Sequence, residues 1–441
     1  MCNSTTTKEK MMKKTLLLLV VLIAGCSKEQ NDNKFYMPGE FEEQEAVWLG
    51  WQGYDPYYPV GADMIESLLP YVQIKIITES DSILRVCKNY LTQREIDTSK
   101  IKFYVIPDNE FWIRDHGAAF IINKNGEMRA VDFEWGTYGY RQWLLEIFNN
   151  DVQKADSIFS KSGASKRGSV DSMMAVADSI PVIKSRIFIE GGSIEVNGKG
   201  TLILNESLTL SRNEGASKDS LEKEFKQVLG VTNIIWLQHG LAEDPHIFQT
   251  IAEKYVGLGT GGHTDEFVKF ADANTILLAW VDESEKDDNP LNRINYDRMS
   301  INYEILKKAK NENGEPFRII KVPIPDLIIQ PIRILDAWAW DDSYNVPISA
   351  FKKSDGWVVG DTAYRVAASS YQNYFVTNGA VLLPTYIKQG SSPEKEERIK
   401  KIFAEVFPGR KQIFIDAMAL NWEGGGIHCG TQQQPKIQLG K

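Results

Sequence analysis

The stretch EGGSIEVNGKGTLIL, residues 190–204, carries the pattern from which the fold is predicted. Glu190 stands before two glycines, and two β-rich runs, 193–196 and 201–204, follow on either side of an Asn-Gly pair. Asn-Gly is a strong hairpin signal, because both central positions of the tight turn need a positive φ. The stretch therefore predicts a β-hairpin with a carboxylate just ahead of its first strand.

Three further stretches repeat this arrangement, each with a polar side chain followed by two β-rich runs around a tight turn. The paired runs are 119–122 with 129–133, 267–270 with 275–280, and 374–377 with 380–383. The polar residues that precede them are Asp115, then His263 with Asp265, then Asn373.

Amphipathic helices are predicted between the hairpins. Ser392-Pro393 is typical of a helix start, and an apolar stripe continues from there to residue 406. A second stripe, 221–229, ends at Gly230 and precedes a strand at 233–237. About five such units fill the chain, and a closed ring of them would gather the polar residues at its centre. Two polar stretches, 151–180 and 282–293, interrupt the pattern and are interpreted as surface insertions.

The charge balance excludes some partners. The 441 residues include 50 basic and 59 acidic side chains, which gives a net charge of -9. This balance argues against nucleic acid as the main partner and favours a cationic substrate.

The N-terminal segment is typical of a bacterial lipoprotein signal peptide. Two lysines precede a short apolar run, 16–24, and small residues lead to Cys26. The run is too short for a membrane span, which needs about 20 apolar residues. We predict a signal peptide at 1–26, lipidation of Cys26, a polar tether at 27–34 and a single domain at 35–441. The mature protein would be extracytoplasmic and membrane-anchored; the alternative is a cytoplasmic protein with an apolar N-terminal helix.

Two thiols would remain after such processing, Cys87 and Cys429, so no disulfide framework exists beyond that one possible pair. Cys87 lies in a predicted helix, 82–91, and is interpreted as a buried hydrophobe. Cys429 follows three glycines, a setting that favours a catalytic thiol.

These residue types suit hydrolysis of a guanidinium, which is planar, cationic and best held by carboxylates. Asp115 and Asp265 would bind the cation, and Cys429 would attack its central carbon as a thiolate. His263 would protonate the leaving ammonia and then activate water. Glu190 would accept a hydrogen bond from the other nitrogen of the histidine.

Candidate substrate contacts are Trp112, Arg114 and Arg141. Trp112 would flank the cation, and Arg141 would hold a substrate carboxylate or brace the loop 134–140. Each motif alone has another interpretation: an inert thiol at Cys429, a surface ion pair at Arg114 with its neighbour, or a simple turn after residue 190. A metal site is not predicted, because the five histidines are scattered.

Five motifs between residues 112 and 435 together resemble the agmatine deiminase and Porphyromonas-type peptidylarginine deiminase family of the guanidine-modifying superfamily. They are WIRDHGAAF, EGGSIEVNGKGT, GGHTDEFVKF, SYQNYFVTNGAVLLP and GGGIHCGTQQQP. The resemblance implies an α/β fold, a five-bladed α/β propeller (pentein) with pseudo-fivefold repeats, an active site on its axis and no cofactor. The implied roles are Cys429 as nucleophile, His263 as general acid/base, Asp115 and Asp265 as guanidinium ligands, Glu190 as histidine partner and Asn373 as a site-lining residue.

The predicted function is a deiminase that converts a guanidinium to a ureido group and releases ammonia. Three departures from the agmatine-specific pattern favour arginine in peptides over agmatine. They are the long segment 244–261, Glu266 after the second aspartate, and Gly430 after the cysteine. The alternatives are an amidinotransferase on the same fold and a non-catalytic guanidine-binding lipoprotein.

Overall fold

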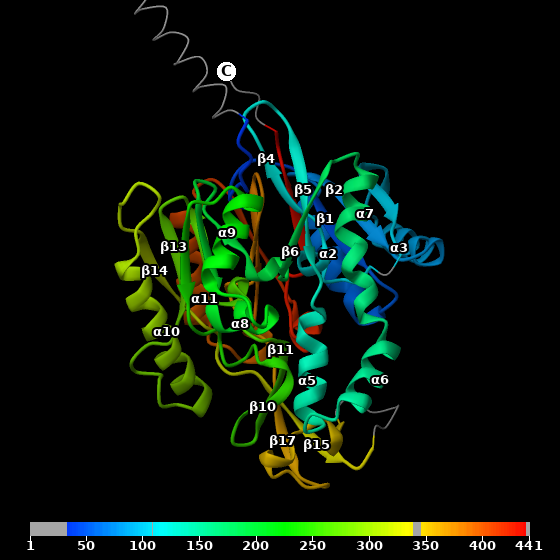
Figure 1. Cartoon of the computed structure of the whole chain (residues 1–441), viewed down its shortest axis with the longest axis vertical. Helices are drawn as coiled ribbons and strands as arrows, with labels where there is room; N and C mark the ends of the chain where they lie inside the picture. Colours follow the sequence, from blue (N-terminus) through cyan, green and yellow to red (C-terminus); the bar gives the residue numbers. More distant parts are fainter. Residues whose placement is uncertain (1–32, 108, 338–344, 438–441) are drawn as a thin grey trace, which may run out of the picture.

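The computed structural model describes residues 33–107, 109–337 and 345–437, whose strands form six sheets with helices packed around them (Figure 1). The predicted signal peptide, the lipidation site Cys26 and most of the predicted tether lie outside the described residues. Within the described ranges, none of the helices combines the length and the apolar composition that crossing a bilayer requires.

Five of the sheets contain one shared unit, an antiparallel pair of strands whose second member pairs in parallel with a third strand. The first four units are β4 (Ala119–Ile122), β5 (Met128–Glu134) and β6 (Val182–Phe188); β7 (Glu195–Val196), β8 (Thr201–Asn205) and β9 (Asn233–Leu237); β12 (Val268–Asp272), β13 (Thr275–Trp280) and β14 (Arg318–Pro323); and β18 (Phe375–Val376), β19 (Ala380–Pro384) and β20 (Lys411–Ile415). All four predicted hairpins are therefore confirmed.

The fifth unit joins the two ends of the described chain. Its antiparallel pair consists of the last strand, β21 (Thr431–Pro435), and the first, β1 (Gln44–Trp51). Strand β1 then pairs in parallel with β2 (Gln73–Thr78), which is followed by β3 (Ile101–Val105).

Helices connect the parallel strands, because parallel neighbours need a crossover connection. The crossover helices are α2 (Tyr58–Leu68), α3 (Asp81–Gln93), α7 (Val170–Ala177), α9 (Lys218–Leu229), α10 (Pro290–Lys308) and α11 (Pro393–Val406). The other helices are α4 (Ile113–His116), α5 (Tyr140–Ile147), α6 (Val152–Ser162), α8 (Glu206–Arg212) and α12 (Met418–Asn421). As predicted, the Ser392 side chain caps α11, Gly230 ends α9 with φ 68°, and Cys87 is buried in α3.

The two stretches interpreted as surface insertions need correction. In 151–180, helix α7 is a crossover helix of the core, and its residues Val170, Met174 and Ala175 are fully buried. In 282–293, the last four residues form the first turn of α10. Both stretches were interpreted as insertions because they begin with many polar residues. The apolar helix faces that pack on the core come only later in each stretch.

Each unit shares an apolar cluster with the next unit along the chain. Ile121 of β4 lies in one cluster with Leu202 of β8, and Ile203 of β8 lies in another with Phe270 of β12. The next two clusters join Leu277 to Val381 and Leu382 to Leu49, and a fifth joins Trp48 of β1 to Phe120 of β4. The fifth cluster connects the last unit to the first.

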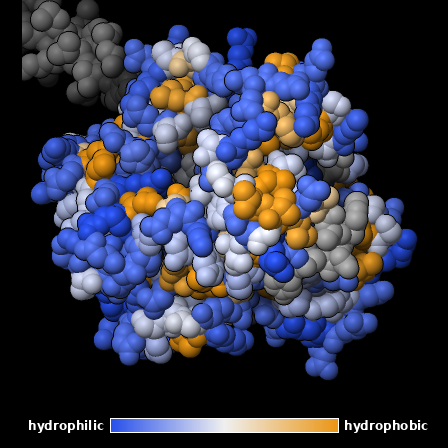
Figure 2. Space-filling model, turned by 90° about the horizontal axis from the view of Figure 1, so that it is seen from below, coloured by the Kyte–Doolittle hydropathy of each residue, from blue (hydrophilic) through white to orange (hydrophobic). Residues whose placement is uncertain are grey.

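The sixth sheet was not predicted. It has the order β10 (His246–Ala252), β11 (Tyr255–Thr260), β17 (Thr362–Val366), β15 (Ile329–Leu335) and β16 (Asn345–Pro347). It lies below the other sheets in Figure 1, beside α5. Figure 2 views this lower face, where apolar groups are scattered over a mainly hydrophilic surface; separate groups of this kind are ordinary.

Candidate active site

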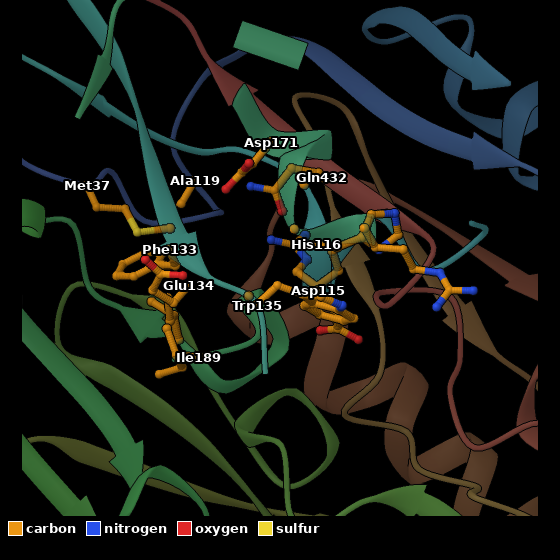
Figure 3. A pocket seen from close by; sticks show the side chains of 16 residues that line it. Met37, Asp115, His116, Ala119, Phe133, Glu134, Trp135, Asp171, Ile189 and Gln432 are labelled. Carbon is orange, nitrogen blue, oxygen red and sulfur yellow. The ribbon is translucent and has the colours of Figure 1, made fainter. Parts of the chain in front are cut away.

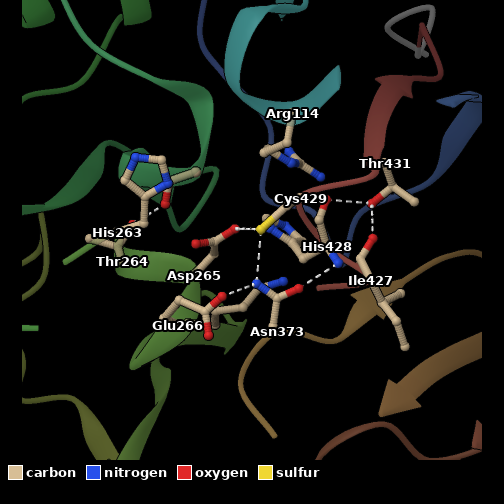
Figure 4. A network of polar contacts seen from close by, with 12 residues as sticks. Arg114, His263, Thr264, Asp265, Glu266, Asn373, Ile427, His428, Cys429 and Thr431 are labelled. Carbon is tan, nitrogen blue, oxygen red and sulfur yellow. Dashed lines mark hydrogen bonds and ion pairs between the residues drawn. The ribbon is translucent and has the colours of Figure 1, made fainter. Parts of the chain in front are cut away.

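The polar residues that precede the first strands of the five units converge, as the sequence predicts. Figure 4 shows four of them, His263, Asp265, Asn373 and Cys429. They are Asp115 before β4, Glu190 before β7, His263 and Asp265 before β12, Asn373 before β18 and Cys429 before β21. All six are at least 95% buried. The repeated unit therefore places one or two functional groups at the same end of each sheet.

The Cys429 thiol contacts two of these groups. Its Sγ lies 3.1 Å from the Nδ2 donor of Asn373 and 3.7 Å from Oδ2 of Asp265. Burial raises the pKa of the thiol well above its usual range, and the nearby carboxylates of Asp265, Glu266 and Asp115 raise it further. The hydrogen bond from Asn373 acts in the opposite direction. Without a bound cation, the site therefore favours the neutral thiol.

His263 lies between two carboxylates and is fully buried. Its Nδ1 is 3.5 Å from Oδ1 of Asp115, and its Nε2 is 3.5 Å from Oε2 of Glu190. Burial alone would lower the histidine pKa, but Asp115, Glu190 and Asp265 together raise it to about 9. The imidazole is therefore protonated at neutral pH and can donate a proton.

Glu190 and Asp244 fix this histidine from two sides. The Arg212 guanidinium donates a hydrogen bond to Glu190 at 2.9 Å. Burial opposes ionisation of the Glu190 carboxyl group, but Arg212 and His263 lower its pKa to about 2. Asp244 accepts the backbone N–H groups of Gly262 and His263, both at 2.9 Å. Asp244 was not predicted, and no residue pattern around it distinguishes it from a surface aspartate.

Asp115 has a different environment. The backbone N–H of Gly192 donates to Oδ1 and the Tyr138 hydroxyl donates to Oδ2, both at 2.9 Å. Burial, followed by the charges of Asp265 and Glu190, raises the Asp115 pKa to about 6 in spite of His263.

Two site side chains approach the backbone closely at Gly192, and this explains the glycine at that position. A Cβ at this position would lie 2.6 Å from Nδ1 of His263 and 2.8 Å from Oδ1 of Asp115. Both distances are far below van der Waals contact, so only glycine allows these two side chains to approach the backbone here.

Asp265 is held by His428, a residue of the C-terminal motif for which the sequence indicated no role. His428 Nδ1 lies 2.7 Å from Oδ2 of Asp265, and its Nε2 lies 2.5 Å from Oε2 of Glu40. Although burial opposes ionisation, His428 and then His263 lower the Asp265 pKa. Glu40 precedes β1, far from every motif, and gave no signal in the sequence.

A pocket of about 230 Å³ leads to the site and is lined by Cys429, Asp115 and Trp112. Further lining residues include Trp135, Tyr138, Tyr140, Ile247 and Leu258, with Glu110 and Glu423 among the charged ones. Trp112 and Cys429 thus line one pocket, and the flanking of the substrate by Trp112 stays a prediction.

Tyr138 reaches this pocket from a strained loop. Thr137 and Tyr138 have φ values of 52° and 54°, which are unusual for a β-branched and an aromatic residue. The loop is fixed by a contact of 2.8 Å between His246 Nε2 and the Tyr138 carbonyl oxygen. Strain of this kind is often found at functional sites.

Asp115 also lines a second, smaller cavity (Figure 3). It has a volume of about 20 Å³ and is lined by His116, Asp171 and Gln432, among others. A space of this size holds about one water molecule. A substrate therefore reaches Asp115 from the larger pocket.

Two predicted substrate contacts are wrong. Arg114 is buried, and its guanidinium donates to Gln433 at 2.6 Å and to Glu40 at 3.4 Å, so it is neither open to substrate nor part of a surface ion pair. Arg141 is 40% exposed, pairs with Asp156 and does not line the pocket that leads to Cys429. Its position could not be inferred because it depends on the bend of the strained loop.

Asp265, Glu266 and Cys429 each offer a ligand atom within 4.8 Å of the others. A group of this kind could hold a metal ion, and the absence of a metal from the site stays a prediction. Asp265, whose pKa is lowered, supplies a negative charge that attracts an organic cation here.

A buried thiol beside two carboxylates, with a protonated histidine between acidic partners, can bind a guanidinium, attack its carbon and protonate the leaving nitrogen. This fold and site define a guanidine deiminase. The chain belongs to the Porphyromonas-type peptidyl-arginine deiminase family, whose sequence model matches residues 36–435.

Individual relatives agree with this assignment. The agmatine deiminase of Stutzerimonas stutzeri is 28% identical over 405 residues, which cover 91% of this chain and 95% of that protein. The agmatine deiminase of Pseudomonas putida is 26% identical over 412 residues, with the same coverage.

Two solved structures share the fold. The agmatine deiminase of Enterococcus faecalis superimposes with a TM-score of 0.66 at 22% identity, covering 91% of this chain and 96% of that one. A cysteine-to-serine variant of the C. jejuni agmatine deiminase, solved with substrate bound, gives a TM-score of 0.62 at 22% identity, covering 91% and 97%. The predicted mixed α/β fold is therefore confirmed.

Proposed function

We propose that this protein hydrolyses agmatine to N-carbamoylputrescine and ammonia through a covalent intermediate on Cys429. The observation that carries the proposal is the burial of this thiol between Asn373 and Asp265, with His263 and Asp115 in the same cluster. The relatives named above support agmatine as substrate. The pocket of about 230 Å³ also suits a small molecule, because pockets for drug-sized ligands start at ~300 Å³.

In the proposed reaction, Asp115 and Asp265 bind the guanidinium and Trp112 flanks it. Oδ1 of Asp265 is buried and has no hydrogen-bond partner within the described part of the chain, so it can accept an N–H of the substrate. The bound cation offsets the negative charges that raise the thiol pKa, so the thiol of Cys429 loses its proton to solvent when the substrate is in place.

The thiolate of Cys429 then attacks the central carbon of the guanidinium. His263 donates its proton to the leaving nitrogen, which departs as ammonia and leaves a thiouronium on the sulfur. The neutral histidine next takes a proton from water, whose oxygen attacks the same carbon. The C–S bond then breaks as the hydroxyl proton of this intermediate passes to the departing sulfur, so the ureido product and the thiol of Cys429 are released.

The test uses the chain from residue 27 onward, incubated with agmatine, free arginine and an arginyl peptide. We expect equal amounts of ammonia and ureido product from agmatine. Absence of both products from all three substrates would contradict deiminase activity. Product that forms only when an amine acceptor is added would indicate an amidinotransferase.

Peptidyl-arginine is the second candidate substrate. Glu266 directly after Asp265, and Gly430 directly after Cys429, resemble peptidylarginine deiminases of the vertebrate type. Turnover of the arginyl peptide without turnover of agmatine would favour this candidate.

We also propose that the five three-strand units form a five-bladed α/β propeller. Three observations support a closed ring: the shared strand order, an apolar cluster between each unit and the next, and the pairing of β21 with β1. The convergence of the residues ahead of each first strand is the geometry expected near the axis of such a ring.

Finally, we propose that the mature protein is an extracytoplasmic lipoprotein held to a bacterial membrane by a lipidated Cys26. The support comes from the basic residues, the short apolar run and the small residues that precede this cysteine.

A further inference from the structure

Four buried charged side chains form a connected series that begins at Asp265, the carboxylate in contact with the Cys429 thiol. The reaction described above gives a role to Asp265 but not to the other three. His428 joins Asp265, at 2.7 Å from its Nδ1, to Glu40, at 2.5 Å from its Nε2. Glu40 in turn accepts hydrogen bonds from Nζ of Lys269 at 3.1 Å and from the backbone N–H of Val376 at 2.9 Å. None of the four charged side chains is more than 8% exposed, and Figure 4 shows His428 beside Cys429 and above Asn373.

His428 connects two buried carboxylates. Both of its ring nitrogens face a carboxylate oxygen, that of Asp265 on one side and that of Glu40 on the other. Glu40 is ionised, because Lys269, His428 and Arg114 hold its pKa below the usual range against the effect of burial. The imidazole therefore forms a bridge between Glu40 and Asp265.

Three other buried carboxyl groups, none of which touches His428, behave differently. Burial raises the pKa of Glu195 to about 8 and that of Asp115 to about 6, and it raises the pKa of Glu266 well above the usual range. The pKa is lowered at Asp265 and Glu40, the two carboxylates that touch His428. A buried carboxylate keeps its charge only with such a partner.

We propose that His428, oriented by Glu40, is a positioning residue that keeps Asp265 ionised and directs its free Oδ1 toward the substrate guanidinium. The two carboxylate oxygens of Asp265 have different contacts. Oδ2 faces the imidazole of His428 and the thiol of Cys429, while Oδ1 has no partner among the described residues. This inference rests on the proposed function, since Asp265 needs a guanidinium to bind.

The test measures agmatine binding by calorimetry across the acidic and neutral pH range, in a Cys429→Ala background that binds but does not turn over. The variant His428→Asn keeps an N–H for Asp265 but carries no charge. We expect its Kd for agmatine to rise at least about tenfold, and the pH at which binding is lost to move upward, because Asp265 takes up a proton more readily. In the active protein, the same substitution should raise KM more than it lowers kcat.

The other charged groups that face this bridge stay unchanged in the variant. They are Glu40 ahead of β1, Arg114 and Asp115 of α4, Glu195 of β7, His263, Asp265 and Glu266 ahead of β12, and Lys269 of β12. His239→Asn is the matched control, because this histidine lies outside the pocket and its side chain makes no contact with the bridge. We expect the control to bind agmatine as its parent does.

Equal affinity and equal pH dependence in the parent and in His428→Asn would overturn the inference while leaving the proposed function intact. If His428→Asn does not fold, Glu40→Gln tests the same bridge and should shift binding in the same direction. A Cys429→Ala parent that binds neither agmatine nor an arginyl peptide would overturn the proposed function itself, before any bridge variant is compared.

Discussion

The sulfur of Cys429 is the atom on which the proposed chemistry depends, and its replacement by oxygen separates binding from turnover. Cys429→Ser keeps the shape of the pocket, but a hydroxyl is a far weaker nucleophile than a thiolate. We expect kcat to fall at least about 1000-fold, while the Kd for agmatine changes little. Ammonia release and calorimetry on the same preparation measure the two quantities; ammonia release at the unsubstituted rate would rule out this cysteine as nucleophile.

Asp115 sets the expected pH dependence. Its pKa of about 6 lies above the ordinary value, so the group takes up a proton as the pH falls through this range and loses the charge that binds the cation. We expect kcat/KM for agmatine to decline below about pH 6. The same protonation affects folding stability in the opposite direction. Because the pKa of Asp115 is raised in the folded protein, the folded state binds this proton more tightly than the unfolded state does, and a fall in pH through this range favours the folded state.

A matched variant checks this assignment. Asp115→Asn removes the titrating group, so its residual kcat/KM should lose the decline near pH 6. A decline at the same pH in the variant would assign it to another group.

Some residues of the site could be predicted from the sequence, and others could not. Asp115, His263 and Cys429 stand beside glycines and hairpin signals, so the repeat itself indicated that they converge. Glu40 and Tyr138 gave no such signal. Glu40 acts through contacts to residues more than two hundred positions away. Tyr138 depends on positive φ values at Thr137 and at Tyr138 itself, two positions at which neither glycine nor asparagine stands.

At the scale of the elements, helix α11 offers a test of local stability. The Ser392 side chain accepts the backbone N–H of Lys395 at 3.4 Å, and a proline occupies the first turn. Ser392→Ala should lower the free energy of unfolding by about 1 kcal/mol. Ser392→Asp is the control, because aspartate also caps helices, and it should retain the stability. Chemical denaturation measures both; no loss in the alanine variant would show that the cap contributes nothing.

The elements best predicted from the sequence are those whose signals are local. Three Asn-Gly turns and one Asp-Ala-Asn turn predicted all four hairpins, and helix caps and apolar stripes predicted helices α9 and α11, within a few residues. The sheet of β10, β11, β15, β16 and β17 was missed because its strands come from two distant segments. Pairings such as that of β11 with β17 depend on the folded chain and leave no mark in either segment alone.

At the scale of the whole molecule, membrane attachment can be tested by cell fractionation. Cys26→Ala removes the thiol that would carry the lipid. We expect the unsubstituted chain in the membrane fraction and the variant in the soluble extracytoplasmic fraction, since covalently attached acyl chains provide the membrane affinity that the variant lacks. Equal distribution of the two proteins would contradict the anchor. Deiminase activity serves as the control for folding and should be unchanged.

The pairing of β21 with β1 also constrains when the enzyme can become active. The strand that follows the nucleophile is made after every other strand described here, and its partner β1 is made before them. Before β21 has been synthesised, a growing chain can hold five complete sheets but neither a positioned sulfur nor the His428 bridge. Catalysis therefore begins only after β21 has paired with β1, so a growing chain that has not yet reached residue 435 cannot consume guanidines.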